Sequence, residues 1–169
     1  LVKILNVRMS LNLKMEVRTQ RSNENWLNST WNRIYNMSRI NQYLLWFANE
    51  NCDFRLPEIQ SIIQLYNISV KWIEGPNDSP FWVVELSYED ACTIASRSVL
   101  LRSVIKLWGF GKTTDELHDS IKNYPSELIS SKLKSDLSFC VNVETFGKTF
   151  TMKEKVDKIE LFNYLPAQD

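Results

Sequence analysis

The chain has 169 residues, of which 44% are apolar and 12% aromatic, and its 20 basic side chains balance its 20 acidic ones. That length accommodates one domain, or one small domain and part of another, around an aromatic-rich core. No apolar run approaches the roughly 20 residues of a membrane-spanning helix, so we expect no membrane partner. Three cysteines, Cys52, Cys92 and Cys140, lack metal-type spacing, which predicts free thiols in a reducing compartment.

The zero net charge conceals an uneven distribution. Residues 1–40 hold seven Lys/Arg and two Asp/Glu, a net charge of +5, whereas residues 41–169 hold thirteen Lys/Arg and eighteen Asp/Glu, a net charge of −5. Free-standing nucleic-acid binders usually carry a basic face. The acidic balance of residues 41–169 therefore argues against strong RNA binding by that region alone.

The leading segment, residues 1–40, is rich in Asn and basic residues. "VKILNV" fits a short strand and "WLNSTWNRIY" a short helix, and neither has a clear partner in the sequence. We interpret residues 1–40 as a leader or disordered extension. Met37 is the natural start on this interpretation, and a mitochondrial transit peptide is the alternative.

Residues 41–111 contain four short apolar or alternating runs and two amphipathic stretches, separated by polar turns. Helix-start signals precede both stretches, with Pro57 in one first turn and Ser87 followed by Asp90 before the other. The order β-α-β-β-α-β predicts a ferredoxin-like domain of the α+β class, with both helices on one face of a four-stranded antiparallel sheet. We expect strands at Tyr43–Ala48, Val70–Glu74, Phe81–Leu86 and Val104–Trp108, and helices at Leu56–Tyr66 and after Ser87.

The same periodicities predict the core of this domain. Apolar residues at helical spacing make one stripe on the first helix, and small residues make a second stripe on the other helix. The expected buried residues are Leu45, Phe47, Ile59, Ile63, Trp82, Val84, Ile94 and Ile105, and the small-residue stripe is Ala91, Ile94, Ala95 and Ser98.

Residues 112–169 begin and end with capping boxes, Thr113-x-x-Glu116 and Thr151-x-x-Glu154, each of which predicts a helix. A second helix is expected around Leu128 to Leu133, and alternation from Phe139 to Val143 predicts a strand. One short strand cannot bury its apolar face or pair its edges alone. We therefore expect this part to be the start of a larger α/β unit.

No catalytic or metal centre is predicted for this chain. Gly109-Phe-Gly-Lys-Thr113 resembles a phosphate loop, but Lys106 stands where that motif needs glycine. We interpret this segment as a flexible joint. His118, the only histidine, lies among acidic residues and is interpreted as solvated, with no nucleophile signature near it in sequence. A dinucleotide-type glycine loop and an Asp-Pro-Pro-Tyr-type motif are both missing from the sequence.

RNA contacts are the remaining candidate function. Lysines and helix N-termini bind phosphates without reading base sequence. Three tryptophans, Trp72, Trp82 and Trp108, have rings that stack on unpaired bases in some proteins, but core packing is the favoured interpretation. The simpler alternative for the charges is an ordinary solvated face. The candidate RNA-binding residues are Arg97, Arg102, Lys106, Lys112, Lys148, Lys153, Lys155 and Lys158.

Several separated segments carry a family resemblance, in order along the chain. They are "YLLWFANENCDFRLPEI" from Tyr43, "SPFWVVEL" from Ser79, "ASRSVLLRSV" from Ala95, "LWGFGKT" from Leu107, "ELHDSIKNYP" from Glu116, and "VETFGKTFT" with "EKVDKIE" up to Glu160. Together they resemble the N-terminal region of the catalytic subunit of the eukaryotic tRNA (guanine-10-N2) methyltransferase. The resemblance covers roughly residues 41–169.

The resemblance implies a ferredoxin-like domain over residues 41–111 and the start of a THUMP domain, an RNA-binding module, over residues 112–169. It implies tRNA as partner and a cytoplasmic location. S-adenosylmethionine would be the cofactor of a catalytic domain expected after Asp169, and a small zinc-containing activator subunit would dock on that domain. On this interpretation the chain alone does not methylate tRNA.

A second class of function remains open. A ferredoxin-like domain can also serve as a protein-interaction or regulatory module with no RNA role, since one fold hosts many functions. The acidic balance of residues 41–169 favours this alternative, whereas the ordered resemblance favours tRNA recognition.

Overall fold

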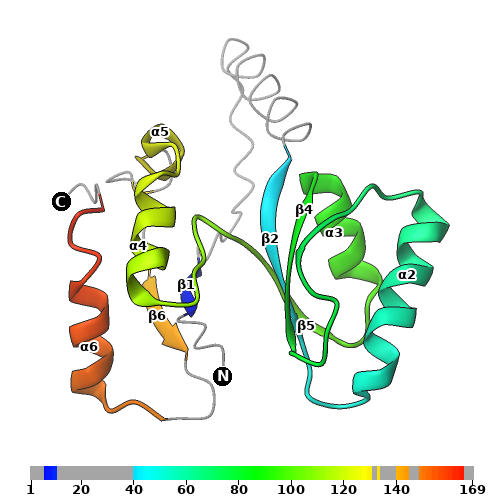
Figure 1. Cartoon of the computed structure of the whole chain (residues 1–169), viewed down its shortest axis with the longest axis horizontal. Coiled ribbons are helices and arrows are strands. Elements are labelled where there is room, and N and C mark those ends of the chain that lie inside the picture. The colour runs from blue at the N-terminus through cyan, green and yellow to red at the C-terminus, as the bar shows by residue number, and fades with distance from the viewer. Residues whose placement is uncertain (1–5, 11–39, 131–132, 134–139, 145–148, 166–169) are drawn as a thin grey trace, which may run out of the picture. The chain divides into compact units, whose positions relative to one another are not determined.

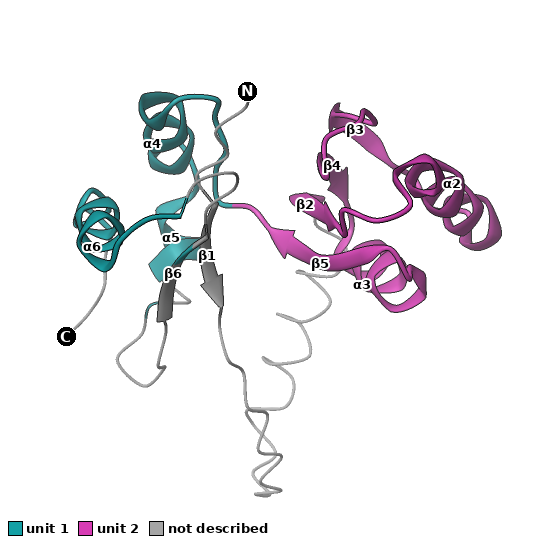
Figure 2. Cartoon of the chain, turned by 90° about the horizontal axis from the view of Figure 1, so that it is seen from below, with its two compact units in different colours: residues 1–17, 108–169 teal, residues 18–107 magenta. Residues whose placement is uncertain are grey.

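A computed structural model describes residues 6–10, 40–130, 133, 140–144 and 149–165 of the chain. The chain divides into two compact units (Figure 2). One unit comprises residues 18–107, and the other combines residues 1–17 with residues 108–169. The expected domain limits at residues 41–111 and 112–169 stay a prediction.

The unit of residues 18–107 contains a four-stranded antiparallel sheet with the strand order β3-β4-β2-β5. Helices α2 and α3 lie on one face of this sheet (Figures 1 and 2). The order along the chain is β-α-β-β-α-β, and the predicted ferredoxin-like arrangement is therefore confirmed. The elements are β2 (Asn41–Phe47), α2 (Arg55–Tyr66), β3 (Lys71–Glu74), β4 (Phe81–Leu86), α3 (Tyr88–Arg97) and β5 (Leu101–Lys106), with a short 3-10 helix η1 (Cys52–Phe54) before α2.

Local signals explain where the two helices begin and end. Pro57 lies in the first turn of α2, where a missing N–H costs no helical hydrogen bond. Asn67 ends that helix in the left-handed conformation, with φ of 51°. Ser87 caps α3, since its hydroxyl oxygen accepts a hydrogen bond from the backbone N–H of Asp90 at 3.0 Å.

The main core lies between the helices and the sheet. Six of the eight residues expected to be buried are buried there, and the other two, Ile63 and Ile105, are only half-buried. Ile63 lies at the margin because Ile59 and Ile62 occupy the centre of the α2 face. Ala95 was wrongly included in the small-residue stripe, since α3 turns it toward solvent. The buried members of this core are Tyr43, Leu45, Phe47, Ile59, Ile62, Ile68, Trp82, Val84, Leu86, Ala91 and Ile94.

The two central strands are apolar on both faces. Alternation along β2 and β4 places Leu44, Trp46, Phe81 and Val83 on the face opposite the two helices. All four side chains are nevertheless buried, with 2–8% of their surface exposed. Continuous apolar runs such as Tyr43–Phe47 are therefore explained by burial on two sides, as in a central strand.

One buried cation, Arg55, joins two loops of this unit. Only 2% of its surface is exposed. Its guanidinium donates hydrogen bonds to the backbone oxygen of Ala48 at 2.6 Å and to that of Asp78 at 3.2 Å, and it lies 5.7 Å from the ring centroid of Phe47. These contacts offset part of the cost of removing water from the charge, whereas the buried Nε of Arg55 has no hydrogen-bond partner among the described residues.

The other unit has its own small core. Leu117, Ile121, Ile129, Leu133 and Phe162 are buried together. Both predicted capping-box motifs begin helices, with the reciprocal box formed at Thr151 and Glu154, and the expected strand is present. The described elements are β1 (Asn6–Ser10), α4 (Thr114–Lys122), α5 (Ser126–Ser130), β6 (Cys140–Glu144) and α6 (Met152–Glu160).

Strand β6 pairs with β1, a partner that the sequence did not reveal. The two strands are antiparallel, with Val7 opposite Val143. The short strand expected near the start of the chain is therefore present at Asn6–Ser10. The expected helix at residues 26–35 and the proposed start at Met37 lie outside the described residues.

The two glycines of the segment interpreted as a flexible joint pack closely on α4. A Cβ atom at Gly109 would lie 2.7 Å from Ile121 Cγ1, and one at Gly111 would lie 2.5 Å from the backbone nitrogen of Leu117. Close approach to the helix therefore explains both glycines without any need for flexibility.

Candidate nucleic-acid interface

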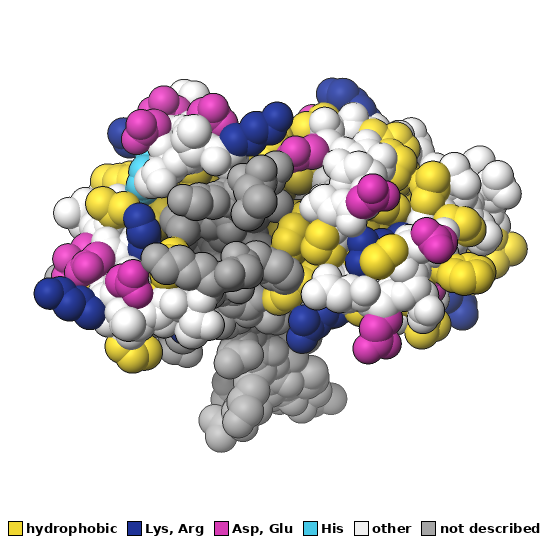
Figure 3. Space-filling view, turned by 60° about the horizontal axis from the view of Figure 1, so that its bottom comes forward, with side chains coloured by type: hydrophobic (Ala, Val, Ile, Leu, Met, Phe, Trp, Pro, Cys, Tyr) yellow, Lys and Arg dark blue, Asp and Glu magenta, His cyan; other side chains and the backbone are white. Residues whose placement is uncertain are grey.

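The eight candidate RNA-binding residues divide between the two units. Arg97, Arg102 and Lys106 belong to the unit of residues 18–107, whereas Lys112 and the lysines of α6 belong to the other. Lys148 lies outside the described residues. Figure 3 shows Lys and Arg side chains dispersed among acidic and apolar ones on the face that it presents.

Arg102 is held against an aromatic ring by an irregularity in the sheet. The pairing of β2 with β5 shifts at Trp46 and Phe47, which face Ser103 and Leu101 and leave Arg102 as the extra residue of a bulge. The Arg102 guanidinium carbon lies 5.0 Å from the ring centroid of Trp46. A guanidinium that lies over an indole ring keeps its outer N–H groups available to an anion.

Arg97 makes a second pair of the same kind. It lies in the last turn of α3, where a cation is favoured by the helix dipole. Its guanidinium carbon is 5.4 Å from the ring centroid of Tyr66, at the end of α2. Tyr66 keeps 39% of its surface exposed, so the ring is accessible from solvent beside the arginine.

The two candidate cations of strand β5, Arg102 and Lys106, do not share one face of the sheet. Lys106 is paired with Tyr43, which belongs to the core on the helical side. Arg102 instead lies over Trp46 on the opposite face. Any polyanion that contacts both residues must therefore pass around β5, which is the edge strand of the described sheet.

The N-terminus of α4 is closed by a carboxylate of its own. Glu116 Oε2 accepts a hydrogen bond from the backbone N–H of Lys112 at 2.8 Å, and the Thr113 hydroxyl oxygen accepts one from the N–H of Glu116 at 3.2 Å. The donors that a helix N-terminus offers to phosphate are thus partly occupied. Lys112 therefore has only its exposed side chain with which to contact RNA.

At the start of α6, by contrast, the acidic side chain returns to the N-cap residue itself. Thr151 and Glu154 form a reciprocal capping box, with the N–H of Thr151 donating to Glu154 Oε2 at 2.8 Å. Lys155 and Lys158 are three residues apart and share one side of the helix, whereas Lys153 lies on another side. The described lysines of the predicted cluster are therefore a pair, Lys155 and Lys158, and the separate Lys153.

The tryptophans proposed for base stacking lie in the cores of the two units. Trp82 is 2% exposed, and half-buried Trp72 meets it edge-on with ring centroids 5.9 Å apart. Trp108 is also half-buried and stacks on Tyr124. The favoured interpretation, core packing, is confirmed for all three. The sequence analysis overlooked Trp46. Its position between the core residues Leu45 and Phe47 indicates that its ring lies on the opposite face of the sheet.

His118 is not the fully solvated residue that was expected. Its ring packs on Phe162, with centroids 4.7 Å apart, and its Nδ1 lies 2.8 Å from the hydroxyl of Tyr164. Lys122 approaches the Tyr164 ring at 5.5 Å from its centroid. Burial raises the pKa of the Tyr164 hydroxyl, which stays protonated at neutral pH. These contacts attach the end of α6 to α4.

Two other kinds of site are absent from the described part of the chain. No group of three or more His, Cys, Asp or Glu side chains is placed to hold a metal ion there. Among the same residues, no helix is long and apolar enough to cross a membrane.

The fold defines an α+β protein with a ferredoxin-like domain and a second compact unit of helices and strands. The family model described as the Tmrp11 THUMP N-terminal domain matches residues 41–168, and the chain belongs to this family. The resemblance deduced from the sequence is thereby confirmed.

Named relatives agree with this assignment. The chain is 40% identical over 131 residues to the tRNA (guanine(10)-N(2))-methyltransferase TRMT11 of Bos taurus and 39% identical over 131 residues to that of Homo sapiens. It is 32% identical over 133 residues to the tRNA (guanine(10)-N(2))-methyltransferase of Saccharomyces cerevisiae. These alignments cover 75–76% of the chain and 28–29% of each relative, so the chain spans less than a third of their length. No solved structure matches the chain.

Proposed function

We propose that residues 41–168 are the tRNA-recognising part of a tRNA (guanine-10-N2) methyltransferase. The observation that carries this proposal is the match of this whole region to a THUMP N-terminal family whose named relatives are methyltransferases of that kind. Binding and positioning of tRNA is the role that suits a region without a catalytic motif of its own.

The cation–aromatic pairs are the contacts that we propose for the tRNA backbone. Arg102 over Trp46 and Arg97 over Tyr66 each present a guanidinium whose orientation is restricted by a ring. A restricted guanidinium loses less side-chain entropy when it binds phosphate, and it can bind two phosphate oxygens at once. Such contacts position RNA without reading its sequence.

Methyl transfer is proposed for the whole protein and not for this chain alone. A catalytic domain elsewhere in that protein would bind S-adenosylmethionine and transfer its methyl group to the exocyclic amine of a guanosine in tRNA. A small zinc-containing activator subunit would bind that domain, and the assembly would work in the cytoplasm. The chain itself is expected to show no methyl transfer when it is purified and supplied with S-adenosylmethionine and tRNA.

A salt titration of tRNA binding tests the proposal. The affinity of the chain for a tRNA transcript is measured by fluorescence anisotropy at several salt concentrations, and log Kd is plotted against log salt. Removal of one cation that neutralises a phosphate of a duplex lowers the slope by about 0.9. Arg102→Ala and Arg97→Ala are each expected to lower it by about that amount.

Lys71→Ala is the matched control for this titration. Lys71 is also a surface cation of the sheet, but its ammonium is paired with Glu85 at 2.8 Å and it is not among the proposed contacts. Its replacement should leave the slope unchanged. Salt-independent binding, or equal effects of all three substitutions, would contradict the proposed RNA contacts.

A further inference from the structure

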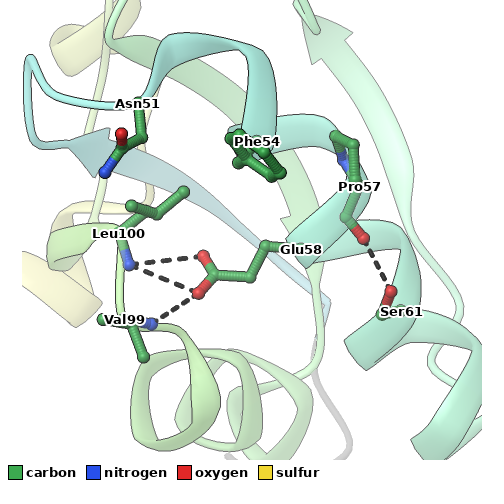
Figure 4. A pocket seen from close by; sticks show the side chains of 7 residues that line it. All are labelled: Asn51, Phe54, Pro57, Glu58, Ser61, Val99 and Leu100. Carbon is green, nitrogen blue, oxygen red and sulfur yellow. Dashed lines mark hydrogen bonds between the residues drawn. The ribbon is translucent and has the colours of Figure 1, made fainter.

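An open hollow lies between the start of α2 and the segment that joins α3 to β5 (Figure 4). Its volume is about 490 Å³. Phe54 and Val99, which are 66% and 88% exposed, present apolar surface on facing sides of this depression. The lining residues are Asn51, Phe54, Pro57, Glu58, Ser61, Val99 and Leu100.

A carboxylate occupies the middle of this hollow. Glu58 accepts hydrogen bonds from the backbone N–H of Val99 at 2.7 Å and from that of Leu100 at 3.3 Å. It also accepts one from the hydroxyl of Ser98 at 2.5 Å. Figure 4 shows Glu58 between the apolar walls, with its carboxylate turned toward Val99 and Leu100. These bonds fix the negative charge in place and hold the wall that carries Val99.

The shape of the hollow argues against a free small molecule as its occupant. Sites for small molecules bury most of their ligand within concave, largely apolar walls. Here the walls are formed by Phe54 and Val99, which are themselves mostly exposed. Such a hollow suits one side chain that projects from a larger partner, because the remaining surface of the partner can cover the exposed walls.

The charge around the hollow selects the class of partner. Glu58 is the only charged residue of the lining, and Glu50 and Asp53 lie in the exposed loop that carries Asn51. Residues 41–107 as a whole hold eight Asp/Glu and five Lys/Arg, a net charge of −3. A phosphate backbone would be repelled from this site, whereas Lys and Arg side chains would be attracted to it.

We propose that the hollow is a docking site for a protein segment that inserts one apolar side chain between Phe54 and Val99 and places an adjacent Lys or Arg near Glu58. This site goes beyond the proposed recognition of tRNA, because it uses an acidic and apolar surface in place of the arginine–aromatic pairs. The domain would then bind protein through one surface and RNA through another.

Selection from a display library of random 12-residue peptides on the full chain tests this proposal. The enriched peptides are then synthesised, and their affinities are measured by fluorescence polarisation. We expect them to share a Leu, Ile, Phe or Trp beside Lys or Arg. Phe54→Ser and Val99→Ser are each expected to weaken binding at least tenfold. Glu58→Gln is expected to weaken it and to reduce its dependence on salt.

Leu65→Ser is the matched control, because Leu65 is an exposed apolar residue of α2 (76%) that does not line the hollow. Binding by this variant should equal that of the parent chain. All four variants are compared with the parent chain in thermal midpoint, so that a loss of folding is recognised. Failure to enrich any peptide, enrichment of acidic peptides, or equal loss with Leu65→Ser would overturn the proposal. A loss of tRNA affinity with Phe54→Ser would assign the hollow to RNA and overturn it as well.

Discussion

Replacement of Ile59 by Ala is expected to destabilise the ferredoxin-like domain by about 3–4 kcal/mol. Ile59 is fully buried (0% exposed) in the core between α2 and the sheet. The substitution removes three carbon atoms, and their transfer free energy is about 2.4 kcal/mol at roughly 0.8 kcal/mol per methylene. The cavity adds a further contribution, because packed neighbours relax only partly. Ile63→Ala, at a half-buried position, should cost about half as much.

Hydrogen exchange of the amides in β2 and β4 is the assay, because it reports the stability of this unit separately from the other. Leu65→Ala is the control, and its exposed position predicts a change below about 0.5 kcal/mol. If Ile59→Ala does not fold, Ile59→Val is measured in its place, and it is expected to cost about 0.5–1.5 kcal/mol. A cost for Ile63→Ala that equals or exceeds the cost for Ile59→Ala would refute the assigned orientation of α2.

Three further perturbations test other parts of the chain. Gly111→Ala should destabilise the unit that contains α4, because its Cβ would lie 2.5 Å from the backbone nitrogen of Leu117, and a fall in thermal midpoint would measure this. Thr151→Ala should cost α6 about 0.5–2 kcal/mol, detected as faster hydrogen exchange in its first turn, since it removes the N-cap. The hydrogen bond from Lys71 lowers the pKa of the Glu85 carboxyl in the folded state. The stabilisation that Glu85 contributes is therefore present above its unfolded pKa and is lost as the pH falls through its folded pKa. The parent chain should therefore exceed Glu85→Gln in thermal midpoint at pH 7, and this difference should vanish as the pH falls below the ordinary value of 4.5.

The architecture of the ferredoxin-like domain could be predicted because its signals are local. Hydrophobic period, turn residues and helix caps identified each strand and helix, and the right-handed crossover rule supplied their arrangement. The position of β5 was less accurate. Strand β5 begins at Leu101, three residues before the expected start. The expected start was late because Arg102 and Ser103 interrupt the apolar run. Polar residues at an edge strand weaken the periodic signal there.

The candidate interface was less predictable, because it depends on which face each side chain occupies. Sequence reasoning identified Arg97 and Arg102 but not their rings, Tyr66 and Trp46. Arg102 and Lys106 have the same parity along the strand, which predicts one shared face. The bulge at Arg102 breaks that parity, and a bulge depends on pairing with a distant strand.

Long-range contacts account for the other differences. The alternating pattern that predicts β6 is local, but the partner strand β1 lies about 130 residues earlier in the chain. No local pattern encodes that pairing. His118 was judged by its acidic sequence neighbours, whereas Phe162 and Tyr164 determine its surroundings. Both cases show that a residue's environment depends on segments that are remote in sequence.

The buried Arg55 has a consequence for the genetics of this protein. Its guanidinium binds the backbone at Ala48, just before the loop that carries Asn51, while its own backbone directly follows Phe54. A screen of random mutations for impaired partner binding would therefore recover substitutions at position 55, although only 2% of that residue reaches the surface. Such alleles would be expected to be temperature-sensitive and to impair protein binding and RNA binding together. Substitutions of Val99 would instead impair protein binding and leave RNA binding intact.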